Sequence, residues 1–286
     1  MTAPRLAPLA AVERLSPACI RILGGNPGKF TLQGTNTYLL GTGRQRILID
    51  TGEGRPAWVA SLQETLREEK AGIKAALISH WHRDHTGGID HLLRIAPEAV
   101  VYKNDPGPGQ SPIHDGQKFY AEGVTLTATH TPGHTRDHTV FVLHEEDAML
   151  TADNVLGHGT AVFEDLAAYL ESLDKMSGLF GGRAYPGHGP VVEDGPGKIV
   201  DYIAHRRQRE EQVLHTMGAS YNPEAETKTA WRAMDLVKSI YSDVPDELHE
   251  AARGGVMQIL VKLEREGRVT RECQDEWRLL RHDATS

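Results

Sequence analysis

The sequence of 286 residues contains little cysteine and no long apolar run. Its two cysteines, Cys19 and Cys273, lie near opposite ends of the chain, which argues against a disulfide-stabilised scaffold and favours a reducing compartment. No stretch approaches the roughly 18 consecutive apolar residues of a transmembrane helix. Residues 1–10 lack the hydrophobic segment and the cleavage pattern of an export signal. We therefore expect a cytoplasmic protein without a membrane partner.

The sequence also has fewer basic than acidic residues. It contains 31 lysines and arginines and 39 aspartates and glutamates, which give a formal net charge of -8. A charge of this sign disfavours non-specific binding to nucleic acids, although it leaves room for a local basic patch. With 39% hydrophobic residues, a chain of this length can bury one large core and a small additional module. The composition is typical of a globular enzyme.

Side chains that bind metals cluster directly after an apolar segment. The run from Ala75 to Ile78 is predicted to be a buried strand. Three histidines and one aspartate follow it within six positions: His80, His82, Asp84 and His85. Residues two apart on an extended chain point to the same side, so His80 and His82 can bind one metal ion. Asp84 and His85 come where the strand turns away, and they can face a second ion. Four unsatisfied polar side chains at a strand end would cost free energy unless they bound a metal ion. This disfavours a purely structural role for the group.

Three later segments share one pattern, in which a short apolar strand runs into a tight turn and then into a single histidine or aspartate. The predicted strands span residues 124–130, 148–151 and 183–185, and the side chains that follow them are His134, Asp153 and His188. Glycine in such a turn lets the backbone adopt positive φ and approach a bound ion closely. The pattern therefore predicts further metal ligands at these positions.

Together these motifs resemble the metallo-β-lactamase superfamily. The resemblance implies seven ligands: His80, His82 and His134 for one zinc ion, Asp84, His85 and His188 for a second, and Asp153 bridging the two. The expected cofactors are thus two zinc ions per chain. One departure is Ala152, because many members have glycine immediately before the bridging aspartate. A methyl group there should be tolerated, with a slight shift of the strand end.

Two zinc ions that share a water would lower its pKa from about 15.7 to about 7 and would stabilise a developing oxyanion. Such a site suits the hydrolysis of acyl groups and of phosphodiesters alike. Asp84 is the candidate catalytic residue, because its free oxygen could orient the hydroxide or receive its proton. Asp50 ends the predicted strand of residues 46–49. It is either a hydrogen-bond partner of a ligand histidine or a cap of the turn, and the sequence leaves both readings open.

Strand-like segments alternate with single amphipathic helices, without internal repeats. Apolar residues at helical spacing predict helices over residues 56–70, 165–179 and 198–217. Strands that are each followed by a covering helix predict an α/β fold in which two sheets pack together with helices outside, an αββα sandwich. We expect this metallo-β-lactamase-fold catalytic domain to span residues 1–222, with the metal ligands at the edge where the strands end.

The character of the chain changes after Asn222. Helices are predicted over residues 227–241, 245–250 and 255–266, followed by a strand over residues 268–270. The resemblance supports a small winged-helix-like module over residues 223–286. Winged helices often contact nucleic acids, but acidic and basic residues are balanced in this segment. We favour a packing module that forms a wall of the pocket or supports a homo-oligomer.

Two groups within the superfamily resemble the chain in further segments. Endoribonucleases of the β-lactamase-like protein 2 group resemble it in residues 26–28, 31–38 and 159–166. Thioesterases that act with fungal non-reducing polyketide synthases resemble it more closely, in residues 26–31, 50–54, 153–159 and 172–176.

The acidic net charge favours the thioesterase group, because a carrier-protein thioester needs no long cationic groove. We therefore predict hydrolytic release of an acyl or polyketide chain from an acyl-carrier protein, by attack of a hydroxide that bridges the two zinc ions. Since carrier proteins are usually acidic, docking would require a local basic patch. The alternative is an endoribonuclease that cleaves single-stranded RNA with the same site. RNA is a partner only in that case, and a basic track should then lead to the metal ions.

Overall fold

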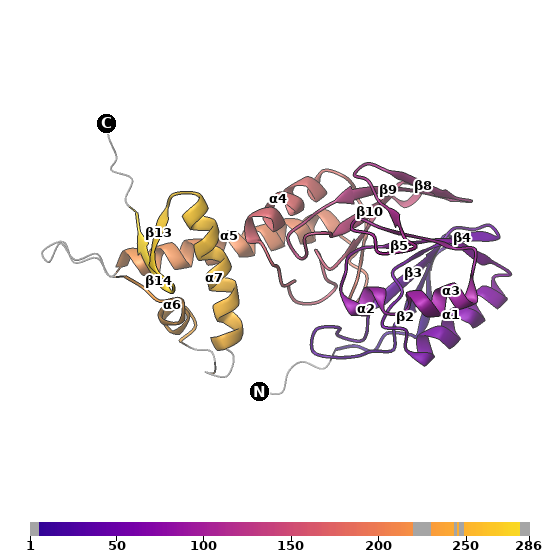
Figure 1. Ribbon diagram of the computed structural model, residues 1–286, viewed down its shortest axis with the longest axis horizontal. Helices are drawn as coiled ribbons and strands as arrows, with labels where there is room; N and C mark the ends of the chain where they lie inside the picture. Colours follow the sequence, from indigo (N-terminus) through magenta and orange to yellow (C-terminus); the bar gives the residue numbers. More distant parts are fainter. Residues whose placement is uncertain (1–5, 220–229, 243–244, 246–248, 281–286) are drawn as a thin grey trace, which may run out of the picture. The chain divides into compact units, whose positions relative to one another are not determined.

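The computed structural model describes residues 6–219, 230–242, 245 and 249–280 (Figure 1). The chain forms two compact units, the first made of residues 1–163 and 168–200, the second of residues 164–167 and 201–286. The predicted domain boundary between residues 222 and 223 lies outside the described residues and stays a prediction. Among the residues that the structure describes, no helix combines the length and the apolar character needed to cross a membrane.

The first sheet has seven strands in sequence order: β1 (Val12–Ser16), β2 (Cys19–Leu23), β3 (Asn36–Leu40), β4 (Gln45–Ile49), β5 (Gly72–Ile78), β6 (Val100–Lys103) and β7 (Ser111–Pro112). Neighbouring strands are antiparallel from β1 to β4 and parallel from β4 to β7. Parallel neighbours need a crossover connection. Helix α1 (Pro56–Glu68) provides it between β4 and β5, and α2 (Arg83–Thr86) with α3 (Ile89–Ile95) provides it between β5 and β6.

The second sheet has the strand order β12-β11-β10-β9-β8. Its strands are β8 (Lys118–Ala121), β9 (Val124–His130), β10 (Thr139–Leu143), β11 (Ala148–Ala152) and β12 (Ala184–Pro186), with the short 3-10 helix η1 (His144–Glu146) before β11. Strands β9 and β11 both run antiparallel to β10, and β12 runs parallel to β11. Strands β9, β11 and β12 therefore point in the same direction and end at the same edge.

The two sheets pack face to face through alternating side chains. Ile47 and Ile49 of β4 contribute to the core between the sheets, where they join Phe141 of β10. Leu48 points to the opposite face and joins a second core, which α1 covers with Trp58. Each such apolar side chain contributes roughly 1.5–3 kcal/mol when fully buried. Burial on both faces explains why β4 is apolar throughout rather than alternating.

Helix α4 (Leu166–Ser177) covers the second sheet, so the order of layers is helix, sheet, sheet, helix (Figure 1). The Tyr169 hydroxyl donates to the Asn154 carbonyl oxygen at 2.5 Å, and the Ser172 hydroxyl donates to the Pro132 carbonyl oxygen at 2.6 Å. Helix α5 (Gly195–Ala219) follows β12. The predicted αββα sandwich is confirmed, and its three long helices were expected at these places.

The second unit contains α6 (Ala233–Ile240), α7 (His249–Arg265) and a hairpin of β13 (Val269–Cys273) with β14 (Glu276–Leu279). The predicted helix over residues 227–241 is shorter, because the Trp231 backbone forms a β-bridge with Trp277 before α6 begins. Residues 227–229 and 246–248 lie outside the described residues.

The prediction of separate helices over residues 245–250 and 255–266 was wrong, since α7 continues from His249 through Gly254 and Gly255. Each glycine inside a helix costs only about 1 kcal/mol relative to alanine. The buried face of Val256, Leu260 and Leu263 outweighs that cost.

Candidate metal centre

Five strand ends meet at one edge of the sandwich, namely those of β4, β5, β9, β11 and β12. The two sheets are joined there by main-chain and side-chain hydrogen bonds. Thr139 N–H donates to the Ser79 carbonyl oxygen at 2.8 Å, and Asn36 N–H donates to the Gly187 carbonyl oxygen at 2.7 Å. The Asn36 amide also donates to the carbonyl oxygens of Pro186 and Gly189, at 2.8 and 2.9 Å. These bonds hold the turn around His188 against the first sheet.

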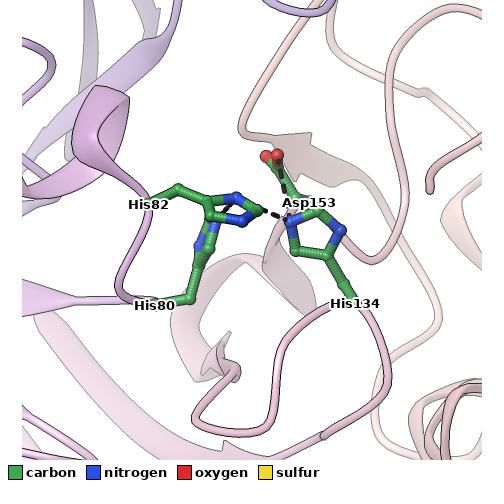
Figure 2. A group of neighbouring side chains, drawn as sticks. All are labelled: His80, His82, His134 and Asp153. Carbon is green, nitrogen blue, oxygen red and sulfur yellow. Dashed lines mark hydrogen bonds and ion pairs between the residues drawn. The ribbon is translucent and has the colours of Figure 1, made fainter. Parts of the chain in front are cut away.

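The first group of side chains at this edge consists of His80, His82, His134 and Asp153 (Figure 2). His80 and His82 follow β5, His134 lies between β9 and β10, and Asp153 follows β11. His82 Nδ1 lies 3.0 Å from His80 Nε2 and 3.2 Å from His134 Nε2. His134 Nε2 lies 3.5 Å from Asp153 Oδ2. Three imidazoles and a carboxylate therefore converge on one point.

The second group consists of Asp84, His85 and His188. Asp84 Oδ2 lies 3.3 Å from His85 Nε2 and 3.2 Å from His188 Nε2. Asp153 also borders this group, with Oδ1 3.4 Å from His85 Nε2 and Oδ2 3.3 Å from His188 Nε2. The structure thus brings together all seven residues expected from the sequence, with Asp153 between the two groups.

Hydrogen-bond acceptors outside the cluster determine which ring nitrogen of several histidines carries the proton. His85 Nδ1 donates to Asp50 Oδ2 at 2.7 Å. The Ser79 hydroxyl donates to the same oxygen at 2.8 Å, so it accepts from His80 Nδ1 at 2.9 Å. His134 Nδ1 donates to the Val162 carbonyl oxygen at 2.8 Å. In its neutral form each of these rings consequently directs the lone pair of Nε2 into the cluster.

The donor atoms of the cluster fit a cation. The lone pairs of several ring nitrogens and two carboxylates face one another, and His82 Nδ1 can donate its single proton to only one neighbour. Among the described residues, the buried His85 Nε2 and Asp153 Oδ1 have no hydrogen-bond partner. Unpartnered buried acceptors are costly, and a bound metal ion would satisfy them. Nitrogen and carboxylate ligands of this kind suit divalent transition metals.

The pKa values of the side chains also show that the carboxylates of the cluster favour a positive charge beside them. Burial lowers the pKa of His80 and of His82, so both rings are neutral. Burial also acts against the charged form of His188, but the Asp153 carboxylate outweighs it and raises the pKa of His188 to about 9. Burial opposes the ionisation of Asp153, yet His188 and His85 hold the pKa of its carboxyl well below the ordinary value. Bound metal ions would take the place of these protons.

Two backbone positions show how closely the turns approach the cluster. A Cβ atom placed on Gly187 would lie 2.2 Å from Asp153 Oδ1, so only glycine fits there. Ala152 adopts a φ of 43°, in the left-handed region that favours glycine. The register of β11 against β12 also shifts between Leu150 and Ala152. The methyl group of Ala152 is accommodated, but in a backbone conformation that alanine rarely adopts.

Asp50 follows β4 and contacts two of the segments that carry the cluster. Its Oδ2 accepts from His85 and Ser79, and its Oδ1 accepts the Ser79 N–H at 2.8 Å. We expect Asp50→Ala to weaken metal affinity by about 10- to 100-fold, because His85 loses the acceptor that fixes its tautomer. Metal content after dialysis against a graded chelator would measure this. Unchanged metal retention beside the wild-type protein would contradict the role of Asp50 as a partner of His85.

Three contacts of the cluster were not anticipated. Ser79 precedes the predicted ligands without an assigned role, yet it links His80 to Asp50. Thr35 lies immediately before β3, and its hydroxyl donates to Asp84 Oδ2 at 3.0 Å. His138 lies behind Asp153 and accepts its N–H at 3.2 Å. The only sequence signal for His138 was its position four residues after His134.

A cavity of about 520 Å³ opens onto the cluster, and His82, Asp84, His134, Asp153 and His188 form its floor. Two loops form its walls, and their apolar lining residues are Phe30, Leu32, Leu156, Ala161 and Val162. The side chains of Phe30 and Val162 are 70% and 60% exposed, which leaves them available to a ligand. A hydrogen bond from Gly28 N–H to the Leu32 carbonyl oxygen, at 3.1 Å, closes the first loop.

A sandwich of two sheets with seven clustered histidine and aspartate side chains at its edge defines a metal-dependent hydrolase fold. A family model described as the metallo-beta-lactamase superfamily matches residues 30–188, which is more than half of the chain. A second one, the beta-lactamase associated winged helix domain, matches residues 233–277. The chain belongs to the metallo-beta-lactamase superfamily and carries its C-terminal winged-helix domain, as the sequence predicted.

Curated relatives match nearly the whole chain. An atrochrysone carboxyl ACP thioesterase of Aspergillus chevalieri is 46% identical over 94% of this chain and 88% of its own length. The lactamase-like protein adaB of Aspergillus niger is 46% identical over 91% of this chain and 84% of its own length. The family and these relatives identify the chain as a hydrolase, and the cluster of side chains indicates a dinuclear metal site.

Solved structures show the same fold at low sequence identity. A beta-lactamase domain protein from Burkholderia ambifaria superposes with a TM-score of 0.78 at 17% identity, over 97% of this chain and 96% of its own. A metallo-beta-lactamase family protein from Thermus thermophilus superposes with a TM-score of 0.72 at 21% identity, over 94% of this chain and 100% of its own.

Proposed function

We propose that the protein is a zinc-dependent thioesterase that releases an acyl or polyketide chain from an acyl-carrier protein. The observation that carries this proposal is the apolar cavity that ends on the metal-binding side chains. Among the described residues that line it, Lys29 is the only lysine or arginine. An acyl chain can bury its carbon skeleton against Phe30 and Val162, whereas a phosphodiester backbone would require several cationic partners.

The relatives support the same substrate class. Two of them carry the name atrochrysone carboxyl ACP thioesterase, from Aspergillus chevalieri and Paecilomyces divaricatus, at 46% and 43% identity. Each match covers at least 85% of the relative's own length, so the comparison includes both the sandwich and the C-terminal segment. A carrier-protein thioester is therefore the first substrate class to test.

We assign one zinc ion to His80, His82 and His134, a second to Asp84, His85 and His188, and a bridging position to Asp153. Zinc takes imidazole and carboxylate ligands in catalytic sites. When bound, the pair would activate a shared water near neutral pH and stabilise negative charge on the thioester carbonyl oxygen. The side chains of this chain have the remaining tasks of holding the substrate and moving protons.

Asp84 is the residue of the cluster best placed to handle a proton. Its side chain is 19% exposed and lines the cavity, whereas the His85 ring is fully buried. The Thr35 hydroxyl donates to Oδ2, the oxygen that faces His188, so the second oxygen of the carboxylate can accept the proton of the attacking water. The products are a carboxylic acid and a thiol. A thiol has a pKa near 8.5, so it can leave as a thiolate without a strong general acid.

Seven basic side chains among the described residues of the second unit are paired with acidic ones. These pairs are Arg232 with Glu276, Arg253 with Glu250, Lys262 with Glu210, Arg265 with Asp165, Arg268 with Glu210, Arg271 with Glu264 and Arg278 with Glu272. Paired surface charges attract a polyanion weakly. These seven side chains therefore do not form a free cationic track for single-stranded RNA.

The test is thiol release from a panel of acyl-pantetheine and acyl-carrier-protein thioesters that differ in chain length. We expect turnover by the zinc-loaded protein and a loss of turnover of more than about 100-fold in His80→Ala. Removal of a metal ligand should lower activity by more than the removal of a residue that only hydrogen-bonds to a ligand. His144→Ala is the matched control, since His144 is exposed, lies outside the cluster and forms a hydrogen bond with the half-buried Thr127. Its turnover should equal that of the wild type.

Failure on every thioester by protein that carries two zinc ions per chain would overturn the proposal. Cleavage of single-stranded RNA by the same preparation would then identify the ribonuclease. Metal-free protein reconstituted separately with zinc, manganese or iron would decide the metal, and the proposal requires zinc to restore thiol release.

A further inference from the structure

His138 is a fully buried histidine that belongs to neither group of proposed metal ligands. It lies directly behind the cluster, with its ring centroid 5.2 Å from that of His80 and 5.8 Å from that of His134. Its Nε2 accepts the main-chain N–H of Asp153 at 3.2 Å. The residue therefore contacts the main chain of the proposed bridging ligand rather than a metal position.

The partners of the ring define its protonation. A main-chain N–H can only donate, so His138 Nε2 must present a lone pair to Asp153. The hydrogen of the neutral ring is then on Nδ1, where it donates to the Thr131 hydroxyl oxygen at 3.1 Å. Hydrogen bonds at both ends of the ring fix its orientation, and neither bond involves a metal position.

The segment around His138 also joins the chain segments that carry other proposed ligands. Thr131 N–H donates to the His138 carbonyl oxygen at 2.9 Å, which closes the turn containing His134. The next residue, Thr139, donates its N–H to the carbonyl oxygen of Ser79, immediately before His80. The Asn154 side-chain amide donates to the Thr131 carbonyl oxygen at 2.9 Å. The segments of His80, His134 and Asp153 therefore meet at this point.

We propose that His138 is a positioning residue that holds the Asp153 main chain so that the carboxylate lies between the two metal positions. The inference rests on the proposed metal-binding role of Asp153. Ala152 has a left-handed φ, which is unfavourable for alanine, so the turn after β11 needs stabilising contacts from elsewhere in the chain. The bond from Asp153 N–H to His138 stabilises that turn, and it satisfies a buried donor at the same time.

The experiment compares two substitutions at this position. His138→Phe keeps the ring volume and removes both hydrogen-bonding atoms, whereas His138→Gln keeps an oxygen acceptor within reach of the Asp153 N–H. We expect His138→Phe to weaken metal affinity by about 10- to 100-fold, which is the usual effect of removing a residue that hydrogen-bonds to a metal ligand. His138→Gln should restore most of the affinity. Metal affinity is measured by competition with a chromophoric chelator on the full chain, so the result does not depend on any substrate.

Control variants separate positioning from general stability. His130→Phe removes an imidazole at the end of β9, where it contacts the Arg136 carbonyl oxygen, and it should leave metal affinity unchanged. Thr131→Val removes the acceptor of His138 Nδ1 and should weaken affinity in the same direction by a smaller factor. This variant keeps the proposal testable if His138→Phe does not fold.

Wild-type metal affinity in folded His138→Phe or in Thr131→Val would overturn the proposal, as would equal losses in His138→Phe and His138→Gln. A lower melting temperature with unchanged metal affinity would show a structural role only. Since no thioester enters the measurement, a failure of the thioesterase proposal would leave this result intact.

Discussion

Replacement of Asp153 by alanine is expected to abolish hydrolysis and to lower metal content in the same protein. The Asp153 carboxylate lies 3.3 to 3.5 Å from nitrogens of both groups, so its removal takes a ligand from two ions at once. Removal of a residue that hydrogen-bonds to a metal ligand lowers metal affinity or activity by up to about 100-fold. Removal of a ligand shared by two ions should lower both metal affinity and activity by more than that. Metal analysis after gel filtration and thiol release on the same sample would measure the two effects together.

Two further variants sharpen that result. Asp153→Asn keeps the shape of the side chain but not its charge, and it should retain part of the metal with little activity. Asp115→Ala removes an exposed carboxylate whose partners are Lys175 and the His130 N–H, and it should behave as wild type. Full retention of metal and activity in Asp153→Ala would refute a dinuclear site centred on this residue.

The second large effect is expected from Gly187→Ala, which adds one methyl group at a residue that has no metal-binding side chain. The new Cβ atom would lie 2.2 Å from Asp153 Oδ1 and 3.0 Å from His85 Cε1, so one of these side chains must move. Inserted methyl groups in tightly packed sites typically cost about 1–3 kcal/mol. Here the displaced atoms belong to proposed metal ligands, and we expect loss of at least one metal ion with activity falling in parallel.

Gly178→Ala is the matched control, because a Cβ atom on Gly178 would meet no atom within 4 Å. Its metal content, activity and melting temperature should all remain at wild-type values. If Gly187→Ala kept both metal ions and its activity, the turn before His188 would have to be more adaptable than the structure shows.

Much of the fold could be predicted because the hydrophobic pattern is strong. Residues 75–78 are apolar throughout and end in polar side chains, which is the pattern of a strand buried on both faces. The strand over residues 124–130 was predicted with its observed bounds. The candidate metal ligands could be predicted for a related reason. Histidines and aspartates immediately after buried strands cost free energy unless a partner such as a metal ion satisfies them.

Other features depend on contacts that no local pattern records. Val162 contributes to the cluster through its main-chain carbonyl oxygen, and every residue type carries that group. The position of His138 behind Asp153 requires β10 and β11 to lie side by side. The start of α6 depends on a β-bridge between Trp231 and Trp277, which are distant in the sequence. In each case the determining partner comes from another part of the chain.

The proposed metal-binding side chains come from both sheets, since His80 to His85 follow β5 while His134, Asp153 and His188 follow strands of the second sheet. Ions bound there would act as a cross-link, in a chain whose two cysteines are both free. Separation of the sheets at this edge would have to break coordination bonds, so metal release and opening of the sandwich become a single event. A chelator would consequently remove a structural brace together with the catalyst.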